Sequence, residues 1–357
     1  MNNCYVDIHV IQTLPPSCVN RDDTGSPKTA LYGGATRARV SSQAWKHAMR
    51  ENFVDLFDKE QLGKRTKRII TLITDKIIEK NPMFVRADVD KKVLDILNDA
   101  GFKIKSVEKG MDALFFMSDQ QAEALGTLYE KKPSDKKEYK NALSKALKDK
   151  PSIDMALFGR MVASDPSLNY DASAQVAHAI STHRVQTEYD YFTAVDDCSP
   201  EDNAGAGHLG TVEFNSSTMY RYATINVREL AEYIGESTPE VVKKFVQSFA
   251  LTMPTGKQNT FANRTVPDMV YVTVRYDQPV NMCGAFEKPV SGDAGFVKES
   301  EERFISYAAN VYDNIIDKPA KEYWSETRGF VALPDRIKFK NILECLETDI
   351  EDYLKER

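Results

Sequence analysis

Three extended segments, far apart along the chain, place the strongest constraint on its fold. Residues 5–14 alternate between apolar and polar side chains, and residues 219–227 and 270–276 are rich in β-branched and aromatic residues. Such segments suit a pleated, half-buried surface, so each of them predicts a β-strand. The chain is therefore expected to contain at least these three strands.

Helical patterns separate these strands. Residues 42–57 have apolar side chains at steps of three and four, and Thr238, followed by Pro239, marks the start of a second helix. The apolar run 153–162 is interpreted as a further strand. Without a charged insertion at 60–150, the order is β-α-β-β-α-β, the ferredoxin-like arrangement of many RNA-recognition modules. The predicted fold class is α+β, although this topology alone hosts many functions.

The segment 21–50 is positively charged in an otherwise acidic chain. It holds six Lys or Arg residues and only two acids, Asp22 and Asp23, whereas the 357-residue chain has a net charge of −6. A cationic window against an acidic background favours an anion site such as a nucleic-acid backbone. The basic residues are Arg21, Lys28, Arg37, Arg39, Lys46 and Arg50.

The helix predicted at 42–57 gives these charges a geometry. Its apolar side chains fall on one face, and polar residues such as Gln43 and Lys46 fall on the opposite face. Ser41 or Ser42 is a natural N-cap, and the N–H groups at a helix start favour a phosphate. The alternative is an ordinary amphipathic surface helix with a solvated basic face.

The segment 183–215 combines acids with aromatic residues and glycines. Its seven acids accompany a single arginine, so the segment does not attract phosphate. Apolar side chains such as Phe192 and Leu209 are suited to stand between successive bases and unstack them. The alternative is that the aromatic side chains, including Tyr189 and Phe214, pack against the rest of the fold.

Other classes of site find little support in the sequence. The glycine-rich segment 204–210 is followed by a β-type segment and not by a helix, so no nucleotide cofactor is expected. No run of about 18 apolar residues predicts a membrane span. The five cysteines are scattered and never spaced as C-x-x-C, so we expect neither a disulfide framework nor a metal site, and a reducing cytoplasm.

A metal-dependent ribonuclease is a competing hypothesis. Asp22 with Asp23, or Asp196 with Asp197, form carboxylate pairs of the kind that hold Mg²⁺ for phosphodiester cleavage. Adjacent aspartates in turns more often bond locally or pair with arginine, and Arg21 precedes the first pair. The histidine candidates are His178 and His183, on a predicted helical segment at 177–183, and His208.

Ten strings of residues carry a resemblance to one known family. They are NRDD (20–23), the Lys28 segment, GG (33–34), RVSSQAWK (39–46), SIDMALFGRM (152–161), AHAISTH (177–183), YFTAVDD (191–197), AGAGHLGT (204–211), FNSSTMYRYATINV (214–227) and AFEKPV (285–290). With these strings the chain resembles the CasC family, the repeated backbone subunit of the type I-E CRISPR surveillance complex Cascade. The strings occur in the expected order over well over half of the chain, which is more specific than a short motif.

The resemblance implies a ferredoxin-like palm that carries two additions. One is a helical insertion called the fingers, which fits the charged helical patterns at 60–150, and the other is a long β-hairpin called the thumb. The implied boundaries are 1–58 for the first part of the palm, 59–150 for the fingers, 151–182 for the second part of the palm, 183–215 for the thumb, and 216–357 for the third part of the palm and the C-terminal helices.

The resemblance also implies a function without catalysis. Copies of the chain would stack head to tail along a guide crRNA and kink it, so that segments of the guide pair with target DNA. The implied partners are crRNA, target DNA, other copies of the chain and the other Cascade subunits, with no membrane and no cofactor. An RNA-binding module that merely shares the palm is a further alternative.

The resemblance and the charge pattern together give three sets of candidate residues. The first contacts the RNA, the second forms the thumb that kinks it, and the third adds further nucleic-acid contacts. The sets are Arg21, Lys28, Arg37, Arg39, Ser41, Ser42, Gln43, Lys46, Arg50 and Met161; then Phe192, Gly207, His208 and Leu209; then Lys257, Gln258 and Arg264.

Overall fold

The structure is a computed structural model that describes residues 3–162, 165–194, 198, 208–292, 294–329 and 336–356. Its contacts divide the chain into two compact units. The first unit contains residues 1–49, 176–224 and 243–357, and the second contains residues 50–175 and 225–242. The two units are described separately.

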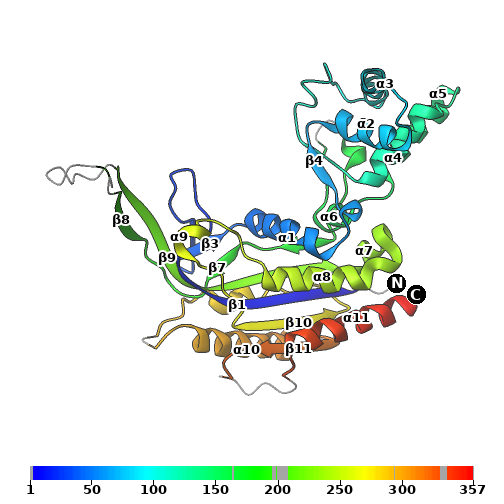
Figure 1. Cartoon of the computed structure of the whole chain (residues 1–357). Helices are drawn as coiled ribbons and strands as arrows, with labels where there is room; N and C mark the ends of the chain where they lie inside the picture. The colour runs from blue at the N-terminus through cyan, green and yellow to red at the C-terminus, as the bar shows by residue number, and fades with distance from the viewer. Residues whose placement is uncertain are drawn as a thin grey trace. The chain divides into compact units, whose positions relative to one another are not determined.

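The first unit is built on a large sheet with antiparallel pairing between its neighbours (Figure 1). All three segments predicted as strands lie in it, and Ile8 pairs with Val272 across its centre. The strand order is β11-β10-β1-β9-β7-β3-β2. The bounds are β1 (Tyr5–Ser17), β2 (Thr29–Tyr32), β3 (Ala35–Val40), β7 (Ala179–Ser181), β9 (His208–Asn226), β10 (Met269–Arg275) and β11 (Lys321–Glu326).

Helices cover both faces of this sheet. On one face, Phe304 of α10 packs with Tyr220 and Tyr271 in a buried aromatic cluster. On the other face, Arg221 of β9 stacks on Trp45 of α1, because successive strand residues point to opposite sides. The helices that contribute to this unit are α1 (Ser42–Leu56), α8 (Thr238–Leu251), α9 (Gln258–Phe261), α10 (Val297–Asn314) and α11 (Phe339–Lys355).

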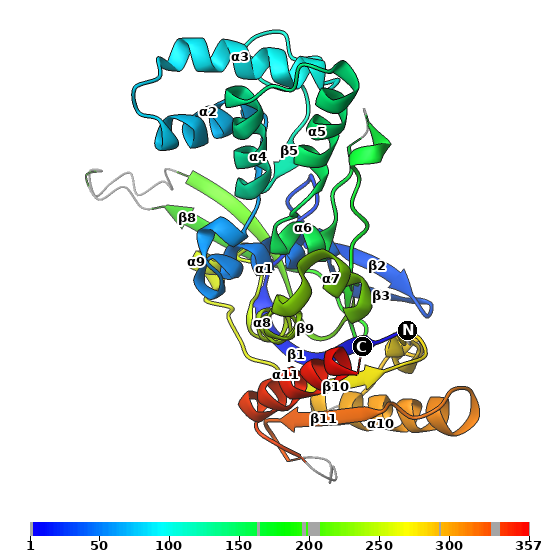
Figure 2. The ribbon, with the colours of Figure 1, turned by 90° about the vertical axis from the view of Figure 1, so that its right-hand side faces the viewer.

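Two hairpins extend this sheet. Strand β8 (Glu188–Ala194) pairs with the first half of β9, and its side chains are all exposed. This hairpin projects beyond the sheet (Figures 1 and 2). The second hairpin joins β2 to β3 through Gly33 and Gly34, both with positive φ. A side chain on Gly33 would collide with the backbone of Glu287, so this turn requires glycine there.

The second unit is mostly helical. Its largest apolar core joins four helices, as their side chains at helical spacing predict. These helices fall within the predicted insertion 59–150, whose boundaries remain a prediction. The elements are β4 (Lys64–Thr66), α2 (Ile69–Lys80), α3 (Arg86–Asp99), β5 (Phe115–Met117), α4 (Asp119–Glu130), α5 (Lys136–Lys148), α6 (Ile153–Phe158), β6 (Ala174–Val176) and α7 (Val227–Ile234).

Two predictions about local structure are wrong. The run 153–162, predicted as a strand, begins with helix α6, which ends at Gly159 with a φ of 76°. The segment 177–183, predicted as helical, contains strand β7. Both segments are short and apolar, and periodicity alone does not separate a buried strand from a buried helical turn.

Candidate nucleic-acid interface

A tight turn shapes the charged loop that follows β1. The Oδ1 atom of Asp22 accepts hydrogen bonds from the backbone N–H of Thr24 at 2.9 Å and of Ser26 at 3.0 Å, and from the Thr24 hydroxyl at 2.7 Å. These bonds, with that of the Thr24 hydroxyl the strongest, lower the pKa of Asp22. Of the two arrangements predicted for these aspartates, local bonding or pairing with arginine, Asp22 adopts the local turn, in which this carboxylate oxygen is already engaged.

Asn20 fastens this loop to the start of α1. The Asn20 carbonyl accepts from the Lys28 N–H at 2.8 Å, and the Asn20 Oδ1 atom accepts from the Ser41 N–H at 2.9 Å. Ser41 is the N-cap, because its hydroxyl oxygen accepts from the Ala44 N–H at 3.3 Å. Of the two serines that the sequence offered, Ser41 is therefore buried in the cap, and Ser42 begins the helix.

A group of basic residues beside this loop consists of Lys28, Arg39 and His178. The Arg39 guanidinium donates to the Thr29 carbonyl at 3.2 Å, and its Nη1 lies 3.0 Å from the His178 Nδ1 atom. Burial first, and then the charges of Arg39 and Lys28, lower the pKa of His178. Because a guanidinium only donates, His178 accepts this bond as a neutral ring.

A second pair of cations, Arg21 and Lys257, lies close to Cys18. Burial raises the pKa of the Cys18 thiol, the charges of Arg21 and Lys257 lower it, and those of Glu213 and Asp22 raise it, so both cations and both acids are near this sulfur. The short helix α9 that follows Lys257 contacts the base of the β8–β9 hairpin, where Phe261 lies 5.8 Å from Phe214 between ring centroids. The loop with Lys257, Gln258 and Arg264, which was predicted to add nucleic-acid contacts, is thus adjacent to the charged loop that follows β1.

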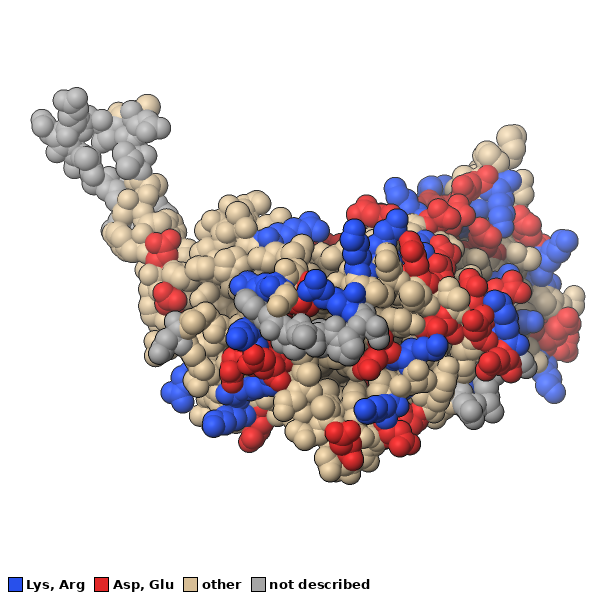
Figure 3. Space-filling view, turned by 90° about the horizontal axis from the view of Figure 1, so that it is seen from below, with Lys and Arg blue, Asp and Glu red and all other residues tan. Residues whose placement is uncertain are grey.

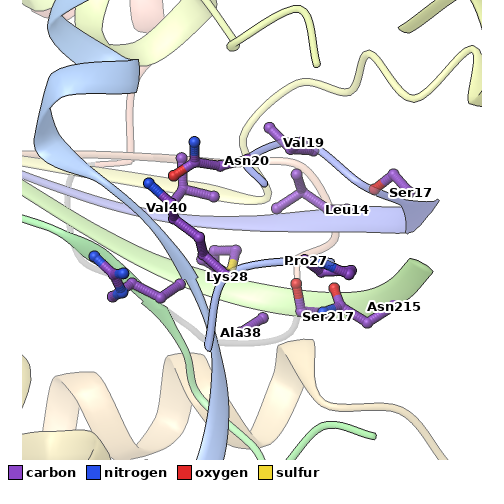
Figure 4. Close-up of a pocket in the computed structure, with 12 residues that line it drawn as sticks. Leu14, Ser17, Val19, Asn20, Pro27, Lys28, Ala38, Val40, Asn215 and Ser217 are labelled. Atoms are coloured by element: carbon purple, nitrogen blue, oxygen red, sulfur yellow. The ribbon is translucent and has the colours of Figure 1, made fainter. Parts of the chain in front are cut away.

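A small polar cavity opens between these elements (Figure 4). Its volume is about 20 Å³. Asn215 and Ser217, which face the same side of β9, contribute side chains that the prediction did not include. The lining residues are Leu14, Ser17, Val19, Asn20, Pro27, Lys28, Ala38, Arg39, Val40, Asn215, Ser217 and Met219.

The prediction that Arg37 contacts RNA needs correction. The Arg37 side chain is fully buried, and it donates to the carbonyl oxygens of Ser181 at 2.8 Å, Phe286 at 2.8 Å and Glu287 at 3.2 Å. Its charge therefore ties β3 to the segment 285–290 and does not reach a ligand. No local sequence signal shows this, because the partners lie far along the chain.

Arg50 is also engaged within the protein, in the second unit. Its Nε donates to the Asp154 carboxylate at 2.9 Å, and its Nη2 donates to the Gly63 carbonyl at 3.3 Å. The Asp154 side chain is only 2% exposed, so removal of Arg50 would leave a buried charge without its partner. This geometry favours a structural ion pair over a phosphate contact.

The other predicted residues have different surroundings. Gln43 is exposed and Lys46 is half-buried, both in the first turns of α1. Met161, in the second unit, is 84% exposed. Gln258 is half-buried and Arg264 is exposed.

The predicted thumb residues are described only in part. Phe192 is 40% exposed, and its ring lies against Gly210, the residue opposite it in β9. His208 and Leu209 are placed by their backbone alone, opposite Ala194 and Thr193. Gly207, like Asp196 and Asp197 of the ribonuclease hypothesis, lies outside the described residues.

Two other classes of site find no support in the described part of the chain. It holds no group of three or more His, Cys, Asp or Glu side chains arranged to hold a metal ion. Nor does any helix there combine the length and apolar character that a membrane crossing demands.

Comparisons with known proteins give a consistent result. The model of a family described as CT1975-like protein matches residues 6–343. A solved chain from a "CRISPR RNA-guided surveillance complex, pre-nicking" is 30% identical with a TM-score of 0.84, and the match covers 97% of this chain and 100% of that one. A second, from a "CRISPR RNA-guided surveillance complex", is 28% identical with a TM-score of 0.64, over 97% and 99%. The comparison with curated proteins gives no match.

Proposed function

Because the chain belongs to the CT1975-like protein family, we propose that it is a subunit of a CRISPR RNA-guided surveillance complex and that it binds the guide RNA without cleaving it. The observation that carries the proposal is the pair of cations Lys28 and Arg39 beside a capped helix start, in a chain of net charge −6. Cations beside helix N–H groups suit phosphate oxygens.

The proposed grip does not read the base sequence. Lys28 and the first turn of α1 hold the backbone, and Arg21 and Lys257 near Cys18 add positive charge. Phosphate contacts position a strand but carry no sequence information, so pairing between guide and target supplies the specificity. One scaffold can then hold any guide.

The topology supports the palm that was predicted from the sequence. In the central part of the sheet the order is β10-β1-β9-β7, with α1 following β1 and β3, and α8 between β9 and β10. We propose that this is a ferredoxin-like core, to which β2, β3 and β11 are added, and that the subunit is the type I-E backbone protein. The similarity to surveillance-complex chains along nearly the full length supports this.

The β8–β9 hairpin is the proposed thumb. Its seven β8 residues are exposed, and two of them, Tyr189 and Tyr191, are 68% and 64% exposed. Such a hairpin buries little of itself in its own chain, which suits contact with a neighbouring copy and its RNA. Copies stacked head to tail would form an open filament along the guide, because a heterologous contact need not close.

Catalysis is not part of the proposal. The Oδ1 atom of Asp22 is engaged by Thr24 and Ser26, which leaves this carboxylate a poor ligand for Mg²⁺. The turn is better explained as the support of the phosphate grip. The ribonuclease alternative then depends on Asp23, or on Asp196 and Asp197, which lie outside the described residues.

The phosphate grip is tested by reversing charge within it. The double variant Lys28→Glu with Lys46→Glu is expected to weaken binding of a single-stranded RNA by at least about 100-fold, since each cation next to a phosphate is worth about 1.5–3 kcal/mol. Binding is measured by fluorescence anisotropy at fixed ionic strength. Arg50 is left unchanged because it pairs with Asp154.

A matched variant controls for net charge. Lys318, between α10 and β11, and Lys340, on α11, are exposed and lie outside the charged loop, so Lys318→Glu with Lys340→Glu makes the same change in charge. It is expected to bind RNA as the unmutated protein does. Equal losses in both variants would contradict the proposed grip. Cleavage of the RNA by the unmutated protein with Mg²⁺ would favour the ribonuclease alternative.

A further inference from the structure

Asn215, which lines the cavity beside the charged loop, has a side-chain donor with no partner among the described residues. This donor, the side-chain amide nitrogen, is buried. Asn215 as a whole is 7% exposed, and Ser217, two residues along the same strand, is 6% exposed. A buried amide without a partner is destabilising, so a ligand that supplies an acceptor here is bound more tightly.

The size of the cavity limits what can enter it. A volume of about 20 Å³ exceeds the roughly 10–15 Å³ that one water molecule requires. One water or one hydroxyl group therefore fits, whereas a nucleobase does not. The cavity is enclosed by the end of β1, the charged loop, β3 and β9 (Figure 4).

The lining indicates a neutral group that both accepts and donates. The Asn215 amide offers a donor and the Ser217 hydroxyl can donate or accept, whereas the Ser17 hydroxyl donates to the Pro15 carbonyl at 2.7 Å and is left as an acceptor. The cations at the cavity, Lys28 and Arg39, are suited to a charged group next to it. A ribose in a single strand presents this combination, because its 2′-hydroxyl lies on the carbon next to the one that carries the 3′-phosphate.

We propose that this cavity receives the 2′-hydroxyl of one ribose of the bound strand, so that the subunit selects RNA over DNA by itself. The inference rests on the proposed binding of RNA, and it adds a selectivity that phosphate contacts do not provide. The 2′-hydroxyl is the group by which a protein distinguishes the two nucleic acids at a given position. Asn215 and Ser217 are then the residues that read it.

The test compares RNA and DNA of the same single-stranded sequence, together with an RNA whose riboses are all 2′-deoxy over one half. The unmutated protein is expected to bind the RNA about 3- to 10-fold more tightly than the DNA for each hydroxyl that it reads. Asn215→Ala is expected to bind RNA about 3- to 10-fold more weakly than the unmutated protein and to bind DNA with unchanged affinity. Asn310→Ala, an exposed asparagine on α10, should change neither.

The outcomes separate the two proposals. If the unmutated protein binds neither nucleic acid, the proposed function fails. If it binds both and Asn215→Ala weakens both equally, a phosphate oxygen occupies the cavity and the inference is wrong. If Asn215→Ala leaves both unchanged, only water occupies it and the inference is also wrong. Should Asn215→Ala unfold, Ser217→Ala is measured in its place, with the same RNA-specific loss expected.

Discussion

At the scale of single residues, this chain uses buried arginines as cross-links between backbone segments. Arg160 donates to the carbonyl oxygens of Phe116, Leu147 and Leu168, and burial lowers its pKa to about 10. Arg221 donates to the Phe249 carbonyl and stacks on Trp45, and burial lowers its pKa to about 9. Both stay protonated at neutral pH. An arginine in this sequence is therefore not in itself a mark of RNA contact, as Arg37 shows.

A buried carboxyl predicts how stability depends on pH. Glu301 is 1% exposed, and burial, followed by the nearby Glu326 and Asp268, raises its pKa to about 8. Folded protein keeps the proton between pH 4.5 and 8, whereas the unfolded chain loses it, so this contribution to stability is lost as the pH rises. Glu301→Gln is expected to be more stable than the unmutated protein at pH 8, by about 1–3 kcal/mol.

Urea unfolding at pH 5, 6, 7 and 8 checks this expectation. Glu302→Gln is the control, because Glu302 is the exposed neighbour on α10, and its curve should follow that of the unmutated protein. A gain from Glu301→Gln that is the same at pH 5 as at pH 8 would show that titration of this group is not the cause.

At the scale of elements, the β8–β9 hairpin combines an exposed aromatic side chain with a glycine opposite it. The Phe192 ring occupies the space where a side chain at Gly210 would lie. Tyr191, its neighbour in β8, points to the other face by strand alternation. The hairpin thus presents exposed aromatic rings on both sides, Tyr189 and Tyr191 on one and Phe192 on the other, which is the form expected of a wedge between bases.

Phe192→Ala is expected to weaken RNA binding by about tenfold, since stacking of a base on an aromatic ring contributes roughly 1–3 kcal/mol. It should also lower the fluorescence of 2-aminopurine at the guide positions that the intact hairpin unstacks. Phe84→Ala, at a 36% exposed phenylalanine of the second unit, is the control. Unchanged fluorescence at every position in Phe192→Ala would remove this residue from the proposed wedge.

The strands and helices differ in how far the sequence predicts them. Strands β1 and β10 and helix α1 were predicted because their patterns of apolar residues are long. The start of α1 is also marked by a local N-cap residue, Ser41. The hairpin of β2 and β3 was treated as a loop, since its turn depends on Glu287 far along the chain. The roles of Arg37 and Asn215 escaped prediction for the same reason: each is decided by strands that only the fold brings together.

At the scale of the whole molecule, the net charge of −6 opposes the binding of a polyanion. Basic and acidic side chains are intermixed on the face seen in Figure 3. Attraction must therefore come from the local cluster around the charged loop, and it acts over distances comparable to the Debye length, about 8–10 Å in physiological salt. RNA binding should be unusually dependent on ionic strength.

We expect the logarithm of the RNA affinity to fall linearly with the logarithm of the salt concentration, with a slope of about −0.7 for each phosphate that is neutralised on a single strand. Titrations between low and physiological salt measure this slope. The Lys28→Glu and Lys46→Glu variant should have a shallower slope, and Lys318→Glu with Lys340→Glu should keep it. An affinity that does not vary with salt would contradict an electrostatic grip.

Asn20 holds together two parts that a flexible loop would leave independent. One of its oxygens fixes the returning end of the loop at Lys28, and the other fixes the first turn of the helix at Ser41. The separation between the two anchoring points is thereby constant in every copy. In the proposed array of copies along a guide RNA, every copy would therefore present the loop and the helix start to the RNA in the same relative position.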